Sequence, residues 1–144
     1  MKNHTTSIKY GIITGIFLIG YFYLLGTLGY VKSPAYSLFN SLICALGIFM
    51  AISEKSQTAH FNPKIGFKTG IRTGLIATVI FTIFFGFYAK NQDGFMTALS
   101  DQIGFISLNY FLLLVIVAAG GVISVYAVTF IIMKAFNKSW SVEN

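Results

Sequence analysis

Small residues recur at every fourth position in one stretch of this chain, FNPKIGFKTGIRTGLIATVIFTIFFGFY (residues 61–88). The series comprises Gly66, Gly70, Gly74, Thr78, Thr82 and Gly86. Residues four apart share one face of an α-helix, so the series predicts a stripe that a neighbouring helix can approach closely. Lys64, Lys68 and Arg72 follow the same interval two residues out of phase, about 200° around the helix. The stretch therefore predicts a helix with one packing face and one basic face.

The composition places this helix in a membrane. Of the 144 residues, 56% are hydrophobic and only 10% are charged, whereas soluble domains carry about 25% charged residues. The chain is long enough for one domain of four apolar runs of about 20 residues each. We therefore expect an all-α membrane protein.

Four apolar runs are the predicted membrane spans. They cover residues 10–31, 35–52, 66–88 and 105–133. The first run is longer than the apolar part of a cleavable signal peptide, so we expect it to be retained. Pro34 and Pro63 are suited to open the second and third helices. A turn at 30–34 and a polar loop at 53–62 then give two helical hairpins.

The segment between the third and fourth runs carries an amphipathic pattern. Phe95, Met96 and Leu99 fall on one helical face together with Ile103, and Asp93 and Asp101 fall elsewhere. This pattern predicts a short interfacial helix within residues 90–102.

The distribution of basic residues predicts the orientation. Eight of the ten Lys and Arg residues lie in three segments. These are the segment before or at the start of the first run, the segment from the end of the second run to the early part of the third, and the segment after the fourth run. Since cytoplasmic segments are enriched in Lys and Arg, both termini should be cytoplasmic. Arg72 should extend its guanidinium to the lipid headgroups. The net charge of +6 then points to anionic lipid, contacted by Lys64, Lys68 and Arg72, and not to nucleic acid.

The first and third runs share a motif that predicts an internal repeat. Lys9, Gly11 and Thr14-Gly15 correspond to Lys68, Gly70 and Thr73-Gly74 at identical spacing. A repeat would relate the two hairpins in parallel about an axis along the membrane normal. Convergence on a common packing device would need no duplication.

The same glycines suggest which helices touch. We expect Gly70, Gly74 and Thr78 to meet Gly11 and Gly15 of the first helix, with Ile76 facing lipid. Because a fourfold repeat drifts about 40° per step, Gly66 and Gly86 should face other neighbours.

Three segments together, IKYGIITGIFLIG, NPKIGFKTGIRTGLIATVI and GGVISVYAVTFIIMKAF, resemble a family of small four-span bacterial membrane proteins of unknown function. The resemblance covers nearly the whole chain and rests on spans and glycine positions. It implies a fold and a bacterial cytoplasmic membrane, and it brings no activity.

Residues typical of catalysis or metal binding form no recognisable pattern. No charged residue lies in the middle of a predicted span, and His4 and His60 have no ligand partners at suitable spacing. No catalytic, cofactor or metal site is predicted. Asn40, Asn109, Ser124 and Thr129 should make interhelical hydrogen bonds, and the single cysteine, Cys44, should be buried.

Three functional classes stay open. The leading one is a non-enzymatic scaffold or accessory subunit that packs onto a membrane protein partner or a second copy. The second is an oligomeric permease for a small solute or lipid, which would require Asn40 and Asn109 to line a polar cavity. The third is a lipid-modifying enzyme, for which only Asp93 and Asp101 could supply an acid on the outer side.

Overall fold

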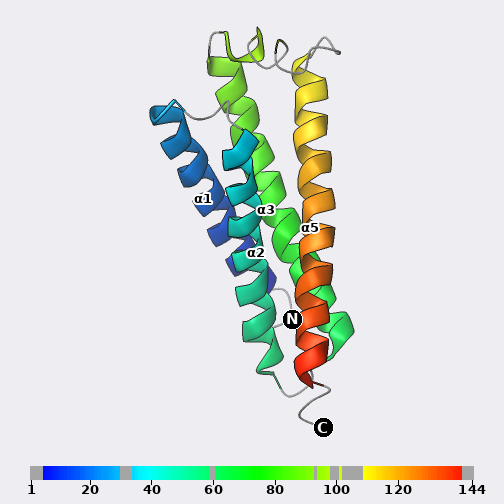
Figure 1. Cartoon of the computed structure of the whole chain (residues 1–144). Coiled ribbons are helices and arrows are strands. Elements are labelled where there is room, and N and C mark those ends of the chain that lie inside the picture. The colour runs from blue at the N-terminus through cyan, green and yellow to red at the C-terminus, as the bar shows by residue number, and fades with distance from the viewer. Residues whose placement is uncertain are drawn as a thin grey trace.

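The computed structural model is an elongated bundle of four helices (Figure 1). It describes residues 5–29, 34–58, 61–92, 94–97, 101 and 109–140, and the side chains of residues 34–38 and 137–140 are not included. The helices are α1 (Thr5–Thr27), α2 (Pro34–Ser56), α3 (Pro63–Asn91) and α5 (Tyr110–Trp140). Every regular element in the described ranges is helical, which confirms the all-α prediction.

The start of α1 and the end of α5 lie at the same end of the bundle (Figure 1). The end of α2 and the start of α3 lie there too, so this end collects Lys9, Lys55, Lys64, Lys68 and Lys134. We call it the basic end and the opposite one the outer end. In the described ranges, Lys90 is the one basic residue near the outer end.

Helix starts follow the expected local chemistry. Pro34 and Pro63 are the first residues of α2 and α3, as predicted. The Asn62 side chain caps α3 by accepting a hydrogen bond from the Ile65 amide at 2.9 Å. After α1, Gly29 adopts a φ of 74°, a left-handed conformation that suits glycine and ends the helix. The predicted turn beyond it, at residues 30–33, lies outside the described ranges.

Three described helices are long and apolar enough to cross a membrane: Thr5–Thr27, Pro63–Asn91 and Tyr110–Phe136. The second predicted span, within α2, is not among them. That helix continues to Ser56, so Glu54 and Lys55 are helical and the predicted loop at 53–62 is shorter than expected. Hydrogen bonds from α1 to Glu54 stabilise this last helical part.

The fourth helix begins later than its apolar run. Its first residue is Tyr110, and Asn109 caps it by accepting a hydrogen bond from the Leu112 amide at 2.7 Å. Asn109 is therefore at a helix end and not in the middle of a span, which corrects the prediction of an interhelical bond. Of the predicted interfacial helix, Phe95–Thr97 form one helical turn, while residues 98–100 and 102–108 lie outside the described ranges.

The glycine stripe of α3 packs on α5 and not on α1. A Cβ atom built on Gly74 would lie 2.5 Å from Val125, and one built on Gly70 would lie 2.6 Å from Thr129. Gly66 and Gly86 also face α5, through Met133 and Leu114 among others, so the predicted change of neighbour is wrong. A helix inclined along a row of i, i+4 positions can follow the whole stripe, and α3 is inclined relative to α5 (Figure 1).

The glycines of α1 do pack on α3, but on isoleucines. A Cβ on Gly11 would lie 2.7 Å from Ile76, and one on Gly15 would lie 2.9 Å from Ile80. Ile76 is thus a packing residue, contrary to the expectation that it faces lipid. Branched side chains fill the glycine notches because they make more van der Waals contacts there than two bare glycine faces would.

Two packed clusters flank the middle of the bundle. Near the basic end, Ile48 and Ile52 of α2 pack with Val125 and Met133 of α5. Near the outer end, the Phe22 ring makes edge-on contacts with aromatic rings of α3. Those rings belong to Phe81, Phe84, Phe85 and Tyr88. Phe95 extends this outer cluster.

Candidate functional site

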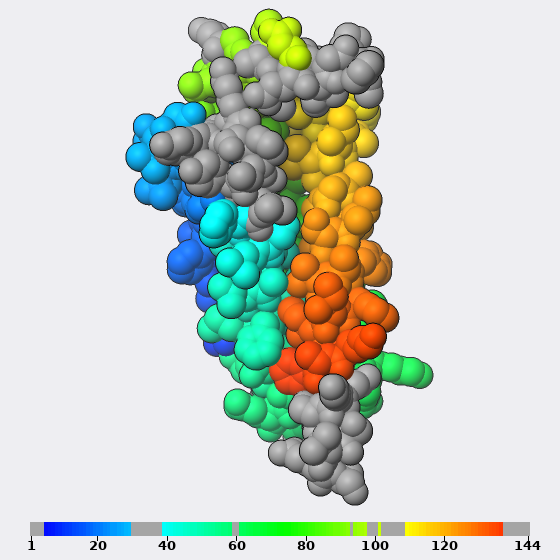
Figure 2. Space-filling model, viewed as in Figure 1, coloured from blue at the N-terminus to red at the C-terminus, as the bar shows by residue number. Residues whose placement is uncertain are grey.

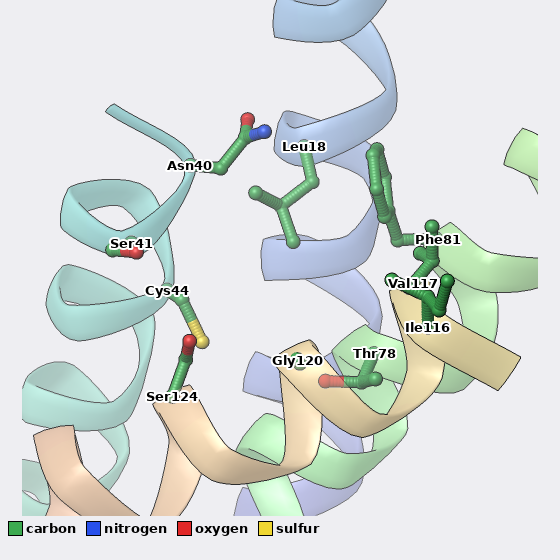
Figure 3. Close-up of a pocket in the computed structure, with 11 residues that line it drawn as sticks. Leu18, Asn40, Ser41, Cys44, Thr78, Phe81, Ile116, Val117, Gly120 and Ser124 are labelled. Atoms are coloured by element: carbon green, nitrogen blue, oxygen red, sulfur yellow. The ribbon is translucent and has the colours of Figure 1, made fainter. Parts of the chain in front are cut away.

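A cavity of about 480 Å³ lies between the two clusters and is lined by all four helices. Leu18 lines it from α1, and Thr78 and Phe81 line it from α3. The facing helices contribute Asn40, Ser41 and Cys44 of α2 and Ile116, Val117, Gly120, Gly121 and Ser124 of α5. Figure 3 shows these side chains around the hollow. On the face in Figure 2, α1, α2 and α5 lie side by side, with α3 behind them.

The Gly120-Gly121 pair of α5 explains why space remains here. A Cβ atom on Gly121 would lie 2.5 Å from Thr78, so this glycine lets α5 approach α3. Gly120 is exposed and lines the hollow, and a Cβ atom there would have no heavy atom within 4 Å, so its missing side chain leaves the edge of the hollow open. Gly121 therefore permits close contact between α5 and α3, and Gly120 leaves space beside that contact.

The cavity wall is mainly apolar with a few polar groups. The Asn40 Oδ1 atom is buried and accepts no hydrogen bond from the described part of the chain. In Figure 3, the Cys44 thiol and the Ser124 hydroxyl point toward one another, about one helical turn along α2 from Asn40. Cys44 is 8% exposed, which confirms that the single cysteine is buried.

The interhelical hydrogen bonds predicted for two of these polar residues are absent. Asn40 Oδ1 and Thr129 Oγ1 are both buried without a partner among the described residues. Thr129 presents its methyl group to Gly70, which leaves its hydroxyl on another side.

The cavity ends at the basic-end cluster. Cys44 and Ser124 line it, whereas Ile48 and Val125, the next residues of α2 and α5 on that side, are fully buried. The hollow is therefore a recess in the bundle and does not continue to the basic end.

A second hollow, of about 330 Å³, lies between α1 and α2. Its polar side chains are largely satisfied, since Thr14 donates to the Tyr10 carbonyl at 2.7 Å. Its lining is Tyr10, Ile13, Thr14, Phe17, Ile43, Leu46, Gly47 and Met50. It contains none of the buried unpartnered atoms of the described residues.

The predicted basic stripe lies away from the cavity. Lys64 and Lys68 are exposed and Arg72 is half-buried on α3. Lys68 precedes Thr78 by ten residues, about 15 Å along the helix. The two sets of predicted residues thus differ in their surroundings. The basic stripe lies toward the basic end, away from the cavity, whereas the glycines of the packing stripe lie in contacts between helices.

A polar cluster joins α1 to α2 at the basic end. The Lys9 ammonium donates to Glu54 Oε2 at 3.0 Å, the Tyr10 hydroxyl donates to the same oxygen at 2.9 Å, and Thr6 donates to Oε1 at 3.2 Å. The bond from Lys9, followed by that from Tyr10, lowers the pKa of Glu54 below its usual range. The sequence pattern alone did not suggest this cluster, because its members are 44 to 48 residues apart.

The other candidate polar residues form no site in the described ranges. His4, His60 and Asp93 lie outside them, and Asp101 is exposed. Within those ranges, no three His, Cys, Asp or Glu side chains are grouped so that they could hold a metal ion.

Comparisons with protein-family models, with curated proteins and with solved structures returned no match. The resemblance to small four-span bacterial membrane proteins therefore stays a prediction. From the sequence, a cavity was considered only for the permease alternative, in which Asn40 would line it; the Gly120-Gly121 pair in the longest apolar run was a second signal that was missed.

Proposed function

We propose that this chain is a non-enzymatic accessory protein of a bacterial cytoplasmic membrane that holds a small apolar molecule within its helix bundle. The mid-bundle cavity is the observation that carries the proposal. Its volume falls within the range of about 300 to 1,000 Å³ that is typical of small-molecule sites, and such sites are mainly apolar with a few polar groups.

All four helices span the membrane in this proposal. The 23 residues of α2 extend about 35 Å, and a hydrocarbon core is about 30 Å thick. The helix packs beside α1, α3 and α5, and its charged residues Glu54 and Lys55 are confined to its last turn, at the basic end. Glu54 is partly exposed there, whereas Lys55 is buried. The two hairpins and the parallel repeat belong to the same proposal. In its support, Thr14 and Thr73 each donate to the carbonyl four residues earlier.

The basic end faces the cytoplasm, with both termini on that side. This orientation is supported by the collection of lysines there and by the enrichment of Lys and Arg in cytoplasmic segments. The cavity then lies in the middle and outer parts of the membrane.

Binding is favoured over permeation by the closed end of the cavity. A solute that entered from the outer side would meet Ile48, Ile52 and Val125, each of which is completely buried. Of the two asparagines that a permease would need, one lines the cavity and the other caps α5. The closed end therefore favours a chain that retains its ligand, and packing onto a partner membrane protein or a second copy belongs to the same proposal.

Filling the cavity tests the proposal. Gly120→Leu adds a side chain at the lining of the hollow, where a Cβ atom would have no heavy atom within 4 Å. Gly20→Leu is the matched control, because Gly20 is also a helical glycine with open space around it and does not line the cavity. Native mass spectrometry should find a copurified apolar molecule on the parent and on Gly20→Leu, but not on Gly120→Leu. An empty parent protein, or retention by Gly120→Leu, would overturn the proposal.

A further inference from the structure

A groove along the seam between α1 and α2 changes from apolar to polar toward the basic end. Its apolar part is the hollow of about 330 Å³ between these helices, and its polar part is a hollow of about 320 Å³. Tyr10 and Met50 line both hollows, so the two adjoin. The polar part is also lined by Phe49, Ser53, Glu54 and Gln57.

The residues of α2 that line the groove share one helical face. Ile43, Leu46, Gly47 and Met50 stand at i, i+3, i+4 and i+7, and Met50, Ser53, Glu54 and Gln57 repeat this spacing. From Ile43 to Glu54 the groove extends about 16 Å along the helix, roughly half of a hydrocarbon core of about 30 Å. In the proposed membrane arrangement, the groove therefore covers the depth of one leaflet, with its polar part at the surface.

Two opposite charges stand at the polar end of the groove and are accessible. The Lys9 ammonium lies 3.0 Å from Glu54 Oε2, and the two side chains are 54% and 40% exposed. Glu54 lines the polar hollow, and the Lys9 ammonium lies 4.8 Å from the centre of the Tyr10 ring. A head group in the polar hollow would contact Glu54 directly and would lie beside Lys9.

The apolar part of the groove suits an acyl chain. Ile13 and Phe17 are 40% and 66% exposed, so this wall is accessible from outside the bundle. Its two hydroxyls are engaged within the protein, since Thr14 donates to the Tyr10 carbonyl and Tyr10 donates to Glu54. A chain that lies there covers apolar surface and displaces no polar contact.

We infer that this groove binds a phospholipid whose head group carries an ammonium beyond its phosphate, with the ammonium at Glu54, the phosphate at Lys9 and an acyl chain in the apolar hollow. A head group with both charges complements the ion pair, whereas a head group with only negative charge would be repelled by Glu54. A carboxylate has about four acceptor sites, and the three donors from α1 leave one for the ammonium. The groove shares no lining residue with the mid-bundle cavity, so this inference relies only on the proposed membrane arrangement.

Two lipids that differ only beyond the phosphate isolate the contribution of the ammonium. Phosphatidylethanolamine and phosphatidylglycerol with identical acyl chains are titrated against the detergent-purified protein, and bound lipid is measured by native mass spectrometry. Glu54→Gln removes the negative charge and keeps an acceptor for Tyr10 and Thr6. Ile13→Trp narrows the apolar hollow. Ile12→Trp is its matched control, because Ile12 is 42% exposed and does not line the groove.

Glu54→Gln should bind phosphatidylethanolamine about fivefold more weakly than the parent does, and phosphatidylglycerol no more weakly. Ile13→Trp should retain less phosphatidylethanolamine than Ile12→Trp. Unchanged binding of phosphatidylethanolamine by Glu54→Gln, or an equal loss of both lipids, would overturn the ammonium contact and with it the inference. Equal binding by the two tryptophan variants would overturn the groove as the site of the chain. The mid-bundle cavity is tested separately by Gly120→Leu.

Discussion

Val125 of α5 fills the notch that Gly74 leaves in α3, and a Cβ atom on Gly74 would lie 2.5 Å from both Cγ atoms of the valine. Val125 is completely buried. A β-branched side chain has one strongly preferred rotamer in a helix, so it cannot turn away from an added methyl group. This contact holds α3 and α5 at a fixed separation beside the cavity.

Gly74→Ala should therefore destabilise the protein by about 1 to 3 kcal/mol, the usual cost of overpacking a filled contact. The measurement is a thermal melt in detergent. Val79→Ala is the control, because Val79 is 57% exposed and its truncation should change the melt little. If Val79→Ala is the more damaging change, α3 presents a different face to α5 from the one described.

Gly66→Ala should cost less than Gly74→Ala, although it lies on the same stripe. The nearest atoms to a Cβ on Gly66 are Sδ and Cε of Met133, at 2.7 and 2.8 Å, and Cζ of Phe61, at 2.8 Å. The Met133 atoms form the flexible end of an unbranched side chain, and Phe61 precedes α3, so both side chains can move aside more readily than Val125 can. The two variants are compared in the same melt, and an equal or larger loss at Gly66 would contradict this account.

The tie between α1 and α2 should weaken in acid. Because hydrogen bonds lower the pKa of Glu54 in the folded state, its contribution is fully present above the unfolded pKa of about 4.3 and is lost as the pH falls through the lower folded pKa. The melting temperature of the parent should fall more steeply below that pH than that of Glu54→Gln. The difference should be small, because the Lys9 and Glu54 side chains are 54% and 40% exposed. Parallel pH profiles would show that the cluster adds nothing.

Topology can be read with an impermeant thiol reagent in a Cys44→Ser background. Gln92 and Gln57 are both exposed, one at each end of the bundle. A cysteine at Gln92 should be labelled in intact cells, and a cysteine at Gln57 only after the membrane is opened. The opposite pattern would place the basic end outside.

The basic stripe should retain anionic lipid. Replacing Lys64, Lys68 and Arg72 together by Gln should reduce the anionic lipid bound in native mass spectra, since each basic residue near a negative leaflet contributes about 1 kcal/mol. Replacing Lys90 at the outer end by Gln is the control. If the triple variant keeps its lipid, the stripe is an ordinary exposed face.

Much of the architecture was determined by local chemistry that the sequence displays. Apolar runs predicted the helices, and Pro34 and Pro63 marked two of their starts, because proline's fixed φ and missing amide suit a first helical position. The spacing of Gly66, Gly70 and Gly74 correctly predicted a packing face on α3. These features depend only on residues within one or two helical turns.

The partners of those faces were decided only by the tertiary structure. The spacing of glycines predicts that another helix approaches closely, but it does not predict whether a glycine, an isoleucine or a valine fills the notch. In the structure, the glycines of α1 contact Ile76 and Ile80 of α3, whereas Gly74 contacts Val125 of α5. The Glu54 cluster and the cavity likewise combine residues from helices far apart in the chain. Such groupings depend on how four helices are inclined to one another, which is set by the sum of many side-chain contacts and not by the period of any single run.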